Sequence, residues 1–326
     1  MIRKSIPALI GFMLVIFYSV SYANAENIFK ENFNKFIDNS HYKITNKVSE
    51  RAQWFDNFFG TEKVNSKNKT TLRFSLGPEW SEVDHLKMQF KLRAKFDLPN
   101  VNKKLKIIII SDSEDQFVNN VDGSNVATEN NTKALNNKNN FLSSALRWSL
   151  DIKKKHHIDL DLGVKFRFPL SPFARAYYAK KIKLNSDWQM TFSQTLFAVL
   201  NDESGETTRL DFDRRIAEKL ALRFSNWATW SDESEGVDLN QTLTINQHIC
   251  LKSAVSYGVG WKSITDPQVR SDQYNMFMNY RQNVFRPWMF FIVKPYAEFT
   301  RKNDWNSDFK IEFLLQAYFG KSNQKK

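Results

Sequence analysis

The sequence predicts an all-β fold, a transmembrane antiparallel up-and-down β-barrel of 12–14 strands. The first observation is the run K-M-Q-F-K-L-R-A-K-F-D-L at 87–98, in which apolar and polar residues alternate. A period of two is that of an extended strand, whereas a helix repeats its apolar residues every three or four positions. Such a run, at about 3.3 Å per residue and tilted by roughly 45°, crosses the hydrocarbon layer of a membrane. The second observation is that similar runs recur to the end of the chain, and the third is a secretion signal before them.

Residues 1–25 are expected to be a secretory signal peptide. Arg3 and Lys4 precede an apolar stretch, and residues 23–25 (Ala-Asn-Ala) have the small-x-small pattern of a cleavage site. An uncleaved signal anchor is the alternative, but Pro7 interrupts the stretch below the spanning length of about 20 residues. Export combined with a barrel predicts the bacterial outer membrane as the location.

Residues 26–66 have a different pattern from the rest of the chain. Phe29, Phe33 and Phe36 recur at helical spacing, and Gly60 fits the end of a second helical segment. We expect a short helical extension that lies in the periplasm or plugs the barrel. Packing on the base of the barrel, lying on the inner membrane surface or holding a periplasmic partner remain open alternatives.

The barrel itself is predicted over 67–320, followed by a basic tail at 321–326. Its strands alternate in polarity throughout, although the first and third runs are weak, so that the count lies between 12 and 14. Short connections follow the even strands, and longer ones, including the Asn-rich 111–143, follow most odd strands, as in outer-membrane barrels. The expected strands are 71–76, 87–98, 104–110, 144–152, 157–168, 172–183, 187–198, 206–214, 219–230, 238–248, 253–261, 273–281, 287–299 and 308–319.

The end of the chain carries a more specific pattern. The run from Phe309 to Phe319, ending A-Y-F, resembles the C-terminal signal of Gram-negative outer-membrane β-barrel proteins, although Gly320 and a basic tail follow it. The segment from about Leu196 to Gly236 is similar to an uncharacterised porin-like group of such barrels. The resemblance covers about residues 50–320 and implies an outer-membrane barrel that the barrel insertion machinery recognises. It implies no activity.

The charge of the chain bears on its partners. The formal net charge is +12, and loss of the two cations in the signal peptide leaves +10. Because the chain is exported, we expect outer-membrane lipids and lipopolysaccharide as its counter-charge and no nucleic acid. The lone Cys250 excludes an internal disulfide, and the sequence contains no pattern typical of a metal or cofactor site, so none is predicted.

The polar faces of the strands predict which residues line the lumen. Lys87, Lys91, Arg93 and Lys95 form a basic ladder, which either favours anions or is neutralised by acids on neighbouring strands. We favour neutralisation, because a small barrel must balance the charges in its interior. The further lumen-lining residues predicted by the alternation are Arg147, Asp159, Asp161, Lys165, Arg167, Arg209, Asp211, Asp213 and Arg223.

Two charge pairs are expected inside the barrel. A three-residue turn at 216–218 would set Asp211 opposite Arg223, which is a stabilising cross-strand pair. Arg147 is expected within reach of the acids at 159 and 161. Aromatic residues that we place at the membrane interfaces are Trp188, Tyr280 and Trp288 at the short turns, and Trp230 and Trp261 at the long loops.

The expected function is a non-enzymatic barrel, either a narrow, charge-lined pore for a small anionic solute or a structural envelope protein. The alternative is a barrel hydrolase of the lipase or protease type acting at the outer face. Its candidate residues are His85, Asp84 and Ser81, three suitable types within five positions of a predicted outer loop.

Overall fold

The computed structural model describes residues 71–83, 85–97, 104–112, 141–152, 155–234, 236–250 and 252–320. The signal peptide at 1–25, the helical extension at 26–66 and the basic tail at 321–326 lie outside these residues. No helix within the described part is long and apolar enough to cross a membrane.

The described chain forms fourteen strands and one short 3-10 helix, η2 (Arg301–Asn303). Fourteen is the upper limit of the expected 12–14 strands. The two weak runs, at 71–76 and 104–110, both form strands. The strands are β1 (Thr71–Ser81), β2 (His85–Asp97), β3 (Leu105–Asp112), β4 (Phe141–Ile152), β5 (His156–Phe166), β6 (Ser171–Lys183), β7 (Trp188–Val199), β8 (Ser204–Ala217), β9 (Leu220–Ser231), β10 (Val237–Cys250), β11 (Ser253–Ile264), β12 (Arg270–Asn283), β13 (Met289–Thr300) and β14 (Ser307–Gly320).

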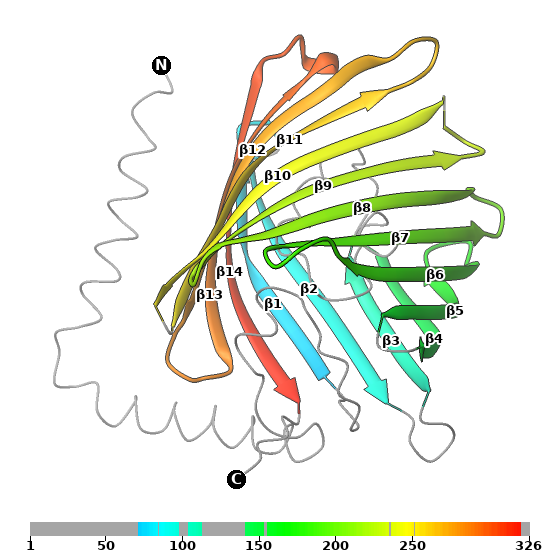
Figure 1. The fold of residues 1–326 in the computed structure, drawn as a ribbon, viewed down its shortest axis with the longest axis horizontal. Helices are drawn as coiled ribbons and strands as arrows, with labels where there is room; N and C mark the ends of the chain where they lie inside the picture. Colours follow the sequence, from blue (N-terminus) through cyan, green and yellow to red (C-terminus); the bar gives the residue numbers. More distant parts are fainter. Residues whose placement is uncertain are drawn as a thin grey trace, which may run out of the picture. The chain divides into compact units, whose positions relative to one another are not determined.

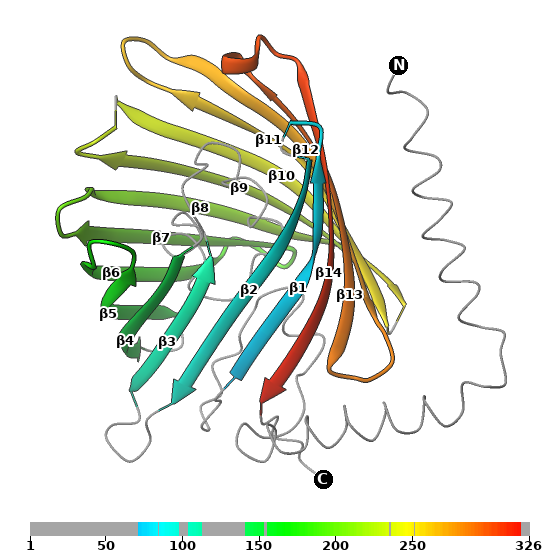
Figure 2. The ribbon, with the colours of Figure 1, turned by 180° about the vertical axis from the view of Figure 1, so that it is seen from behind.

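The strands make one closed antiparallel barrel (Figure 1). Each strand pairs with its neighbours in sequence, and β1 pairs with β14 from Thr71↔Gly320 to Ser81↔Lys310. The view from behind shows β1 and β14 side by side where the ring closes (Figure 2). The predicted all-β, antiparallel up-and-down barrel, which is also the architecture implied by the resemblance to outer-membrane barrels, is confirmed.

The two faces of the barrel wall differ in polarity. On β12, Gln273, Asn275 and Asn279 are buried, whereas Tyr274 and Met276 between them are about half exposed. A closed single-layer ring has only an inner and an outer face, so that the buried polar residues line the interior and the exposed apolar ones point outward. This distribution is the reverse of that in a water-soluble protein and is typical of a membrane barrel.

Glycines let neighbouring groups approach the inner face of the wall. A Cβ atom on Gly77 would lie 1.8 Å from the carbonyl oxygen of Phe313, so only glycine fits where β1 meets β14. On β5, a Cβ on Gly163 would lie 2.5 Å from the ring of Phe173, its cross-strand neighbour on β6. The missing side chain therefore leaves room for an aromatic ring to lie along the wall.

The connections are more even in length than the sequence predicted. Most odd strands extend further than expected, so that the loop between β1 and β2 shrinks to residues 82–84 and that between β7 and β8 to 200–203. The one long connection is 113–140, which lies outside the described residues. The expected contrast between short turns and long loops was therefore too large, because polar strand ends were interpreted as loops.

Candidate functional site

A pocket in the inner wall is lined by basic side chains from both ends of the barrel sequence. Of the described residues that line it, five are cationic and none is acidic. The cations, which we call the basic wall, are Arg73 on β1, Lys91 and Arg93 on β2, Arg281 on β12 and Lys294 on β13.

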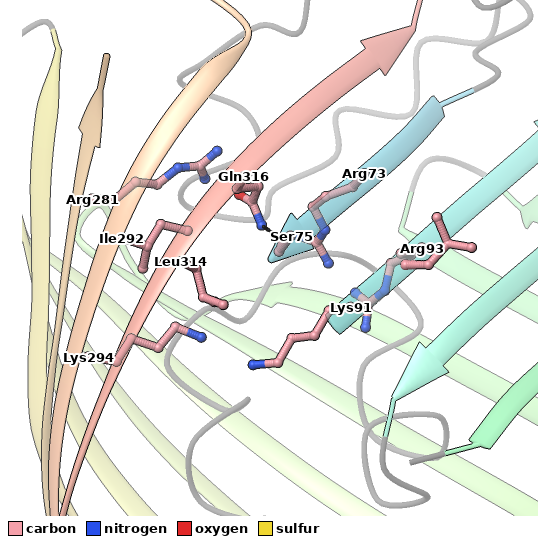
Figure 3. Close-up of a pocket in the computed structure, with 10 residues that line it drawn as sticks. Arg73, Ser75, Lys91, Arg93, Arg281, Ile292, Lys294, Leu314 and Gln316 are labelled. Atoms are coloured by element: carbon pink, nitrogen blue, oxygen red, sulfur yellow. Dashed lines mark hydrogen bonds between the residues drawn. The ribbon is translucent and has the colours of Figure 1, made fainter. Parts of the chain in front are cut away.

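The strand order explains why these cations meet. Arg73 and Arg93 are directly opposite in the β1–β2 register, and Ser75 is opposite both Lys91 and, across the closure, Gln316. The Gln316 Nε2 donates a hydrogen bond of 2.8 Å to the Ser75 Oγ, which ties β14 to β1 beside the pocket (Figure 3). Closure of the ring therefore assembles the pocket from strands that are far apart in sequence.

One buried carboxylate bridges the two lysines. Figure 3 shows Lys91 and Lys294 extending toward each other from β2 and β13. The Glu312 carboxylate on β14 lies 2.6 Å from the Lys91 Nζ and 3.3 Å from the Lys294 Nζ. A single carboxylate thus forms ion pairs with two lysines. The charge of the basic ladder on β2 is therefore partly neutralised by an acid from another strand.

Aromatic rings hold Arg281 in place. Its guanidinium carbon lies 3.9 Å from the centroid of the Phe290 ring and 5.0 Å from that of Tyr318. Contacts of this kind attract a cation to the ring face and restrict its rotamers. Arg281 is therefore a fixed positive group at the edge of the pocket.

The opposite part of the inner wall has a different arrangement, a chain of alternating charges. Arg147 on β4 binds both oxygens of Asp161, at 2.7 and 2.9 Å, and its third nitrogen lies 3.1 Å from Asp159. Arg175 on β6 also binds Asp161, and the His157 Nε2 lies 3.1 Å from Asp159. All but the histidine are almost fully buried. Burial of so many charges requires this mutual pairing.

A second group of paired charges lies on β8 and β9, with a register different from the predicted one. Arg223 pairs with Asp213 at 2.6 Å, whereas Asp211 is opposite Ser225 and accepts from Arg209 on its own strand. The prediction of Asp211 opposite Arg223 was wrong. The strands extend to a two-residue turn at 218–219 with a register shift between Arg215 and Ala217, which moves the pairing by two positions. We call the four arginines and four aspartates of this region the paired wall: Arg147, Arg175, Arg209, Arg223, Asp159, Asp161, Asp211 and Asp213.

The remaining predicted lumen residues lie near the ends of strands. Lys87 is opposite Glu79 in the β1–β2 register, and Lys95 is opposite Thr71. Lys165 and Arg167 both approach Asp202, at 3.8 and 2.6 Å, beside the loop before β8. In that loop burial raises the pKa of the Glu203 carboxyl, and nearby Lys165 opposes the rise.

The aromatic residues proposed for the membrane interfaces lie at or near strand ends. Trp188 begins β7 and Trp230 is half exposed near the end of β9. Trp288 precedes β13 and packs on Phe319, with 5.9 Å between ring centroids. Trp261 lies within β11 and Tyr280 within β12, each a few residues from the end of its strand.

The candidate hydrolase residues do not form a described catalytic group. Ser81 is buried, and its Oγ donates a 3.1 Å hydrogen bond to the Asp308 carboxylate on β14. His85 begins β2 with a φ of 57°, and Asp84 lies outside the described residues. Within the described part, no three His, Cys, Asp or Glu side chains gather as a metal site requires.

Sequence reasoning did not identify most of the basic wall. Arg73, Arg281 and Lys294 all lie on the polar face of a predicted strand, which was the available signal. These residues come together only because β1 pairs with β14. That pairing can be predicted from the sequence only when the exact number of strands is known. Glu312 was missed for the same reason, since it contacts Lys91 only across the closure. Arg175 of the paired wall was also not identified, although the strand that carries it was predicted.

Comparison with known proteins gives similarity of architecture. No family model matches the sequence, and no curated protein is similar to it in sequence. Among solved structures, the CymD monoaromatic hydrocarbon channel is 8% identical with a TM-score of 0.45, covering 79% of this chain and 89% of that one. The OmpT loop-deletion mutant of Vibrio cholerae is 9% identical with a TM-score of 0.45, covering 78% and 98%. A KdgM porin in complex with disordered oligogalacturonate is 11% identical with a TM-score of 0.37, covering 54% and 92%.

Proposed function

We propose that this protein is a non-enzymatic pore of the bacterial outer membrane whose lumen favours small anions. The observation that carries the proposal is the basic wall, five cations around one pocket on the inner face of a closed barrel. Rings and rows of cationic side chains in a pore attract anions, and the low-dielectric barrel around them strengthens the field.

The outward face of the same strands supports the proposed membrane location. Met88 and Phe90 on β2 and Leu160 and Leu162 on β5 are 40–68% exposed in the isolated chain. Apolar surface of this extent around a barrel needs a hydrocarbon solvent, which a membrane provides. The secretion signal predicted at 1–25 fits export to such a membrane.

Recordings in planar lipid bilayers test this function. The purified full-length protein should give discrete conductance steps, and a salt gradient should give a reversal potential on the anion side. The variant with Lys91→Glu, Arg93→Glu and Lys294→Glu should shift the reversal potential toward cations, because three positive groups of the basic wall become negative.

A matched control variant measures the effect that the change in net charge has by itself. Arg270→Glu, Arg301→Glu and Lys302→Glu change the same number of charges on exposed residues near the β11–β12 and β13–β14 loops. This control should shift the reversal potential much less. Electrically silent membranes would reject the pore in favour of a structural envelope protein, and equal shifts in the two variants would reject the basic wall as the selective element.

A further inference from the structure

The two rims of the barrel carry opposite charge. We define the basic rim as the described turns that follow the even strands, with three residues on either side, together with Thr71–Arg73 and Tyr318–Gly320 at the chain ends. It contains twelve cations and four acids, Asp97, Asp151, Asp187 and Glu218. The cations are Arg73, Lys95, Lys104, Lys106, Lys155, Lys181, Lys183, Arg215, Lys219, Lys252, Arg281 and Arg286. Two of the twelve, Arg73 and Arg281, also belong to the basic wall, so that ten cations of the rim lie outside it.

The opposite rim, defined in the same way from the described loops that follow the odd strands, is acidic. It contains seven cations and fourteen acids, which is an excess of seven negative charges. The basic rim has an excess of eight positive charges. The acids are Glu79, Glu82, Asp112, Asp202, Glu203, Glu206, Asp232, Glu233, Asp238, Asp266, Asp272, Glu298, Asp304 and Asp308, and the cations are Lys87, Lys165, Arg167, Lys262, Arg270, Arg301 and Lys302. The positive charge of the barrel is thus concentrated at the end that carries both ends of the β-sheet.

The basic rim also has apolar groups at its turns. A large apolar side chain that is 45–81% exposed lies in or beside each described turn from β4 to β13. These side chains are Ile152, Leu184, Ile216, Ile249 and Phe285. Apolar residues interspersed with lysines suit the boundary between acyl chains and headgroups, where lysine stems lie along apolar surface and their ammonium groups reach the polar layer.

Arg214 and Trp188 show this arrangement on the outer face next to the rim. They are directly opposite in the β7–β8 register, and the Arg214 guanidinium carbon lies 5.4 Å from the centroid of the Trp188 ring. Their strands place them on the same outward face as Phe212 and Met190. Tryptophan is enriched at the headgroup level of membranes, and the face of its ring attracts a cation such as the guanidinium of Arg214.

We propose that the basic rim is a docking surface for anionic phospholipid headgroups of the leaflet at the end of the barrel that carries Thr71 and Gly320. The proposal rests on the proposed membrane location but not on conduction through the lumen. Charge complementarity selects the phosphodiester headgroup, and the apolar turn residues select a lipid surface over a water-soluble acidic protein. Lysines and arginines near an anionic leaflet bind it electrostatically over a distance of about one Debye length.

Tryptophan quenching by brominated lipids tests the proposal. The full-length protein is reconstituted in phosphatidylcholine vesicles that contain a minor fraction of phosphatidylglycerol, with the bromine on one lipid or the other. We expect stronger quenching by brominated phosphatidylglycerol than its mole fraction gives, and we expect this preference to fall as salt rises.

Two variants of equal charge locate the preference. Lys183→Gln, Lys219→Gln and Lys252→Gln neutralise exposed lysines at three successive turns of the basic rim. Arg270→Gln, Arg301→Gln and Lys302→Gln neutralise three exposed cations of the acidic rim. The first variant should lower the preference for phosphatidylglycerol by about fivefold or more, the effect of one cation or more at an anionic surface, and the second should leave it nearly unchanged.

The outcomes separate this proposal from the proposed function. A wild-type protein without preference for phosphatidylglycerol overturns the docking surface, and so does an equal loss in both variants. A protein that keeps the preference but conducts no ions supports the docking surface and rejects the pore. Circular dichroism of both variants in vesicles shows that each is a folded barrel before the lipids are compared.

Discussion

The paired wall and the basic wall line the same barrel but treat charge differently. On the paired wall, four arginines alternate with four aspartates, and Asp161 alone binds two guanidinium groups. On the basic wall, five cations surround a pocket and Glu312 is shared by two lysines. The comparison shows that one part of the inner face pairs each arginine with a carboxylate, whereas the other gathers five cations around a pocket with one carboxylate between two of them.

The largest effect is expected from breaking the paired wall at its centre. Asp161→Asn keeps the shape of the side chain but leaves Arg147 and Arg175 buried beside each other without the carboxylate that binds both. Removal of one partner from a buried ionic network lowers the free energy of unfolding by about 3–5 kcal/mol. Urea unfolding of the barrel in lipid vesicles measures this change.

The control for this variant is Asp187→Asn, on an exposed turn between β6 and β7. It should change the free energy of unfolding by no more than about 0.5 kcal/mol. A loss for Asp161→Asn no larger than that of the control would show that the buried ionic chain contributes nothing to stability.

A second way to break the paired wall acts through packing. Gly163→Val places a side chain where the Phe173 ring lies, 2.5 Å from the position of the new Cβ. Displacing the ring and the β4–β5 backbone should lower stability by about 1–3 kcal/mol. The double variant with Phe173→Ala should recover part of the loss, and the absence of recovery in the same unfolding experiment would contradict the ring contact.

The smallest effect concerns the corrected register of β8 and β9. Asp213→Arg alone and Arg223→Glu alone should each destabilise the barrel, and the double variant should restore part of the stability, because the pair is directly opposite. The coupling expected for an opposed pair of charges is about 0.2–1 kcal/mol. A double-mutant cycle of Asp213→Arg with Arg223→Glu measures this coupling energy. The control cycle of Asp211→Arg with Arg223→Glu should give a smaller coupling energy, because Asp211 is opposite Ser225.

The sequence was sufficient for the strands but not for the assembly of the site. Alternation of polarity located a run for each of the fourteen strands, although it left the count between 12 and 14, since the residues of a strand point in turn to its inner and outer face. The β8–β9 register was missed because the irregularity between Arg215 and Ala217 has no signal in the alternation. The pocket was missed because it needs β1, which carries Arg73, and β13, which carries Lys294, on the two sides of β14. The pairing of β1 with β14 exists only when the ring closes. Local pattern thus determines the face of a residue, and closure determines its neighbours.

The central claim is that successive residues of one strand face lipid and lumen in turn. The direct test uses a Cys250→Ser background, which removes the native thiol, with single cysteines at Phe90, Lys91, Leu92 and Arg93 on β2. In vesicles, thiols at 91 and 93 should react with a charged, water-soluble reagent, while those at 90 and 92 should be protected and contact lipid-borne spin labels. Equal reactivity at all four positions, or the reverse pattern, would contradict it.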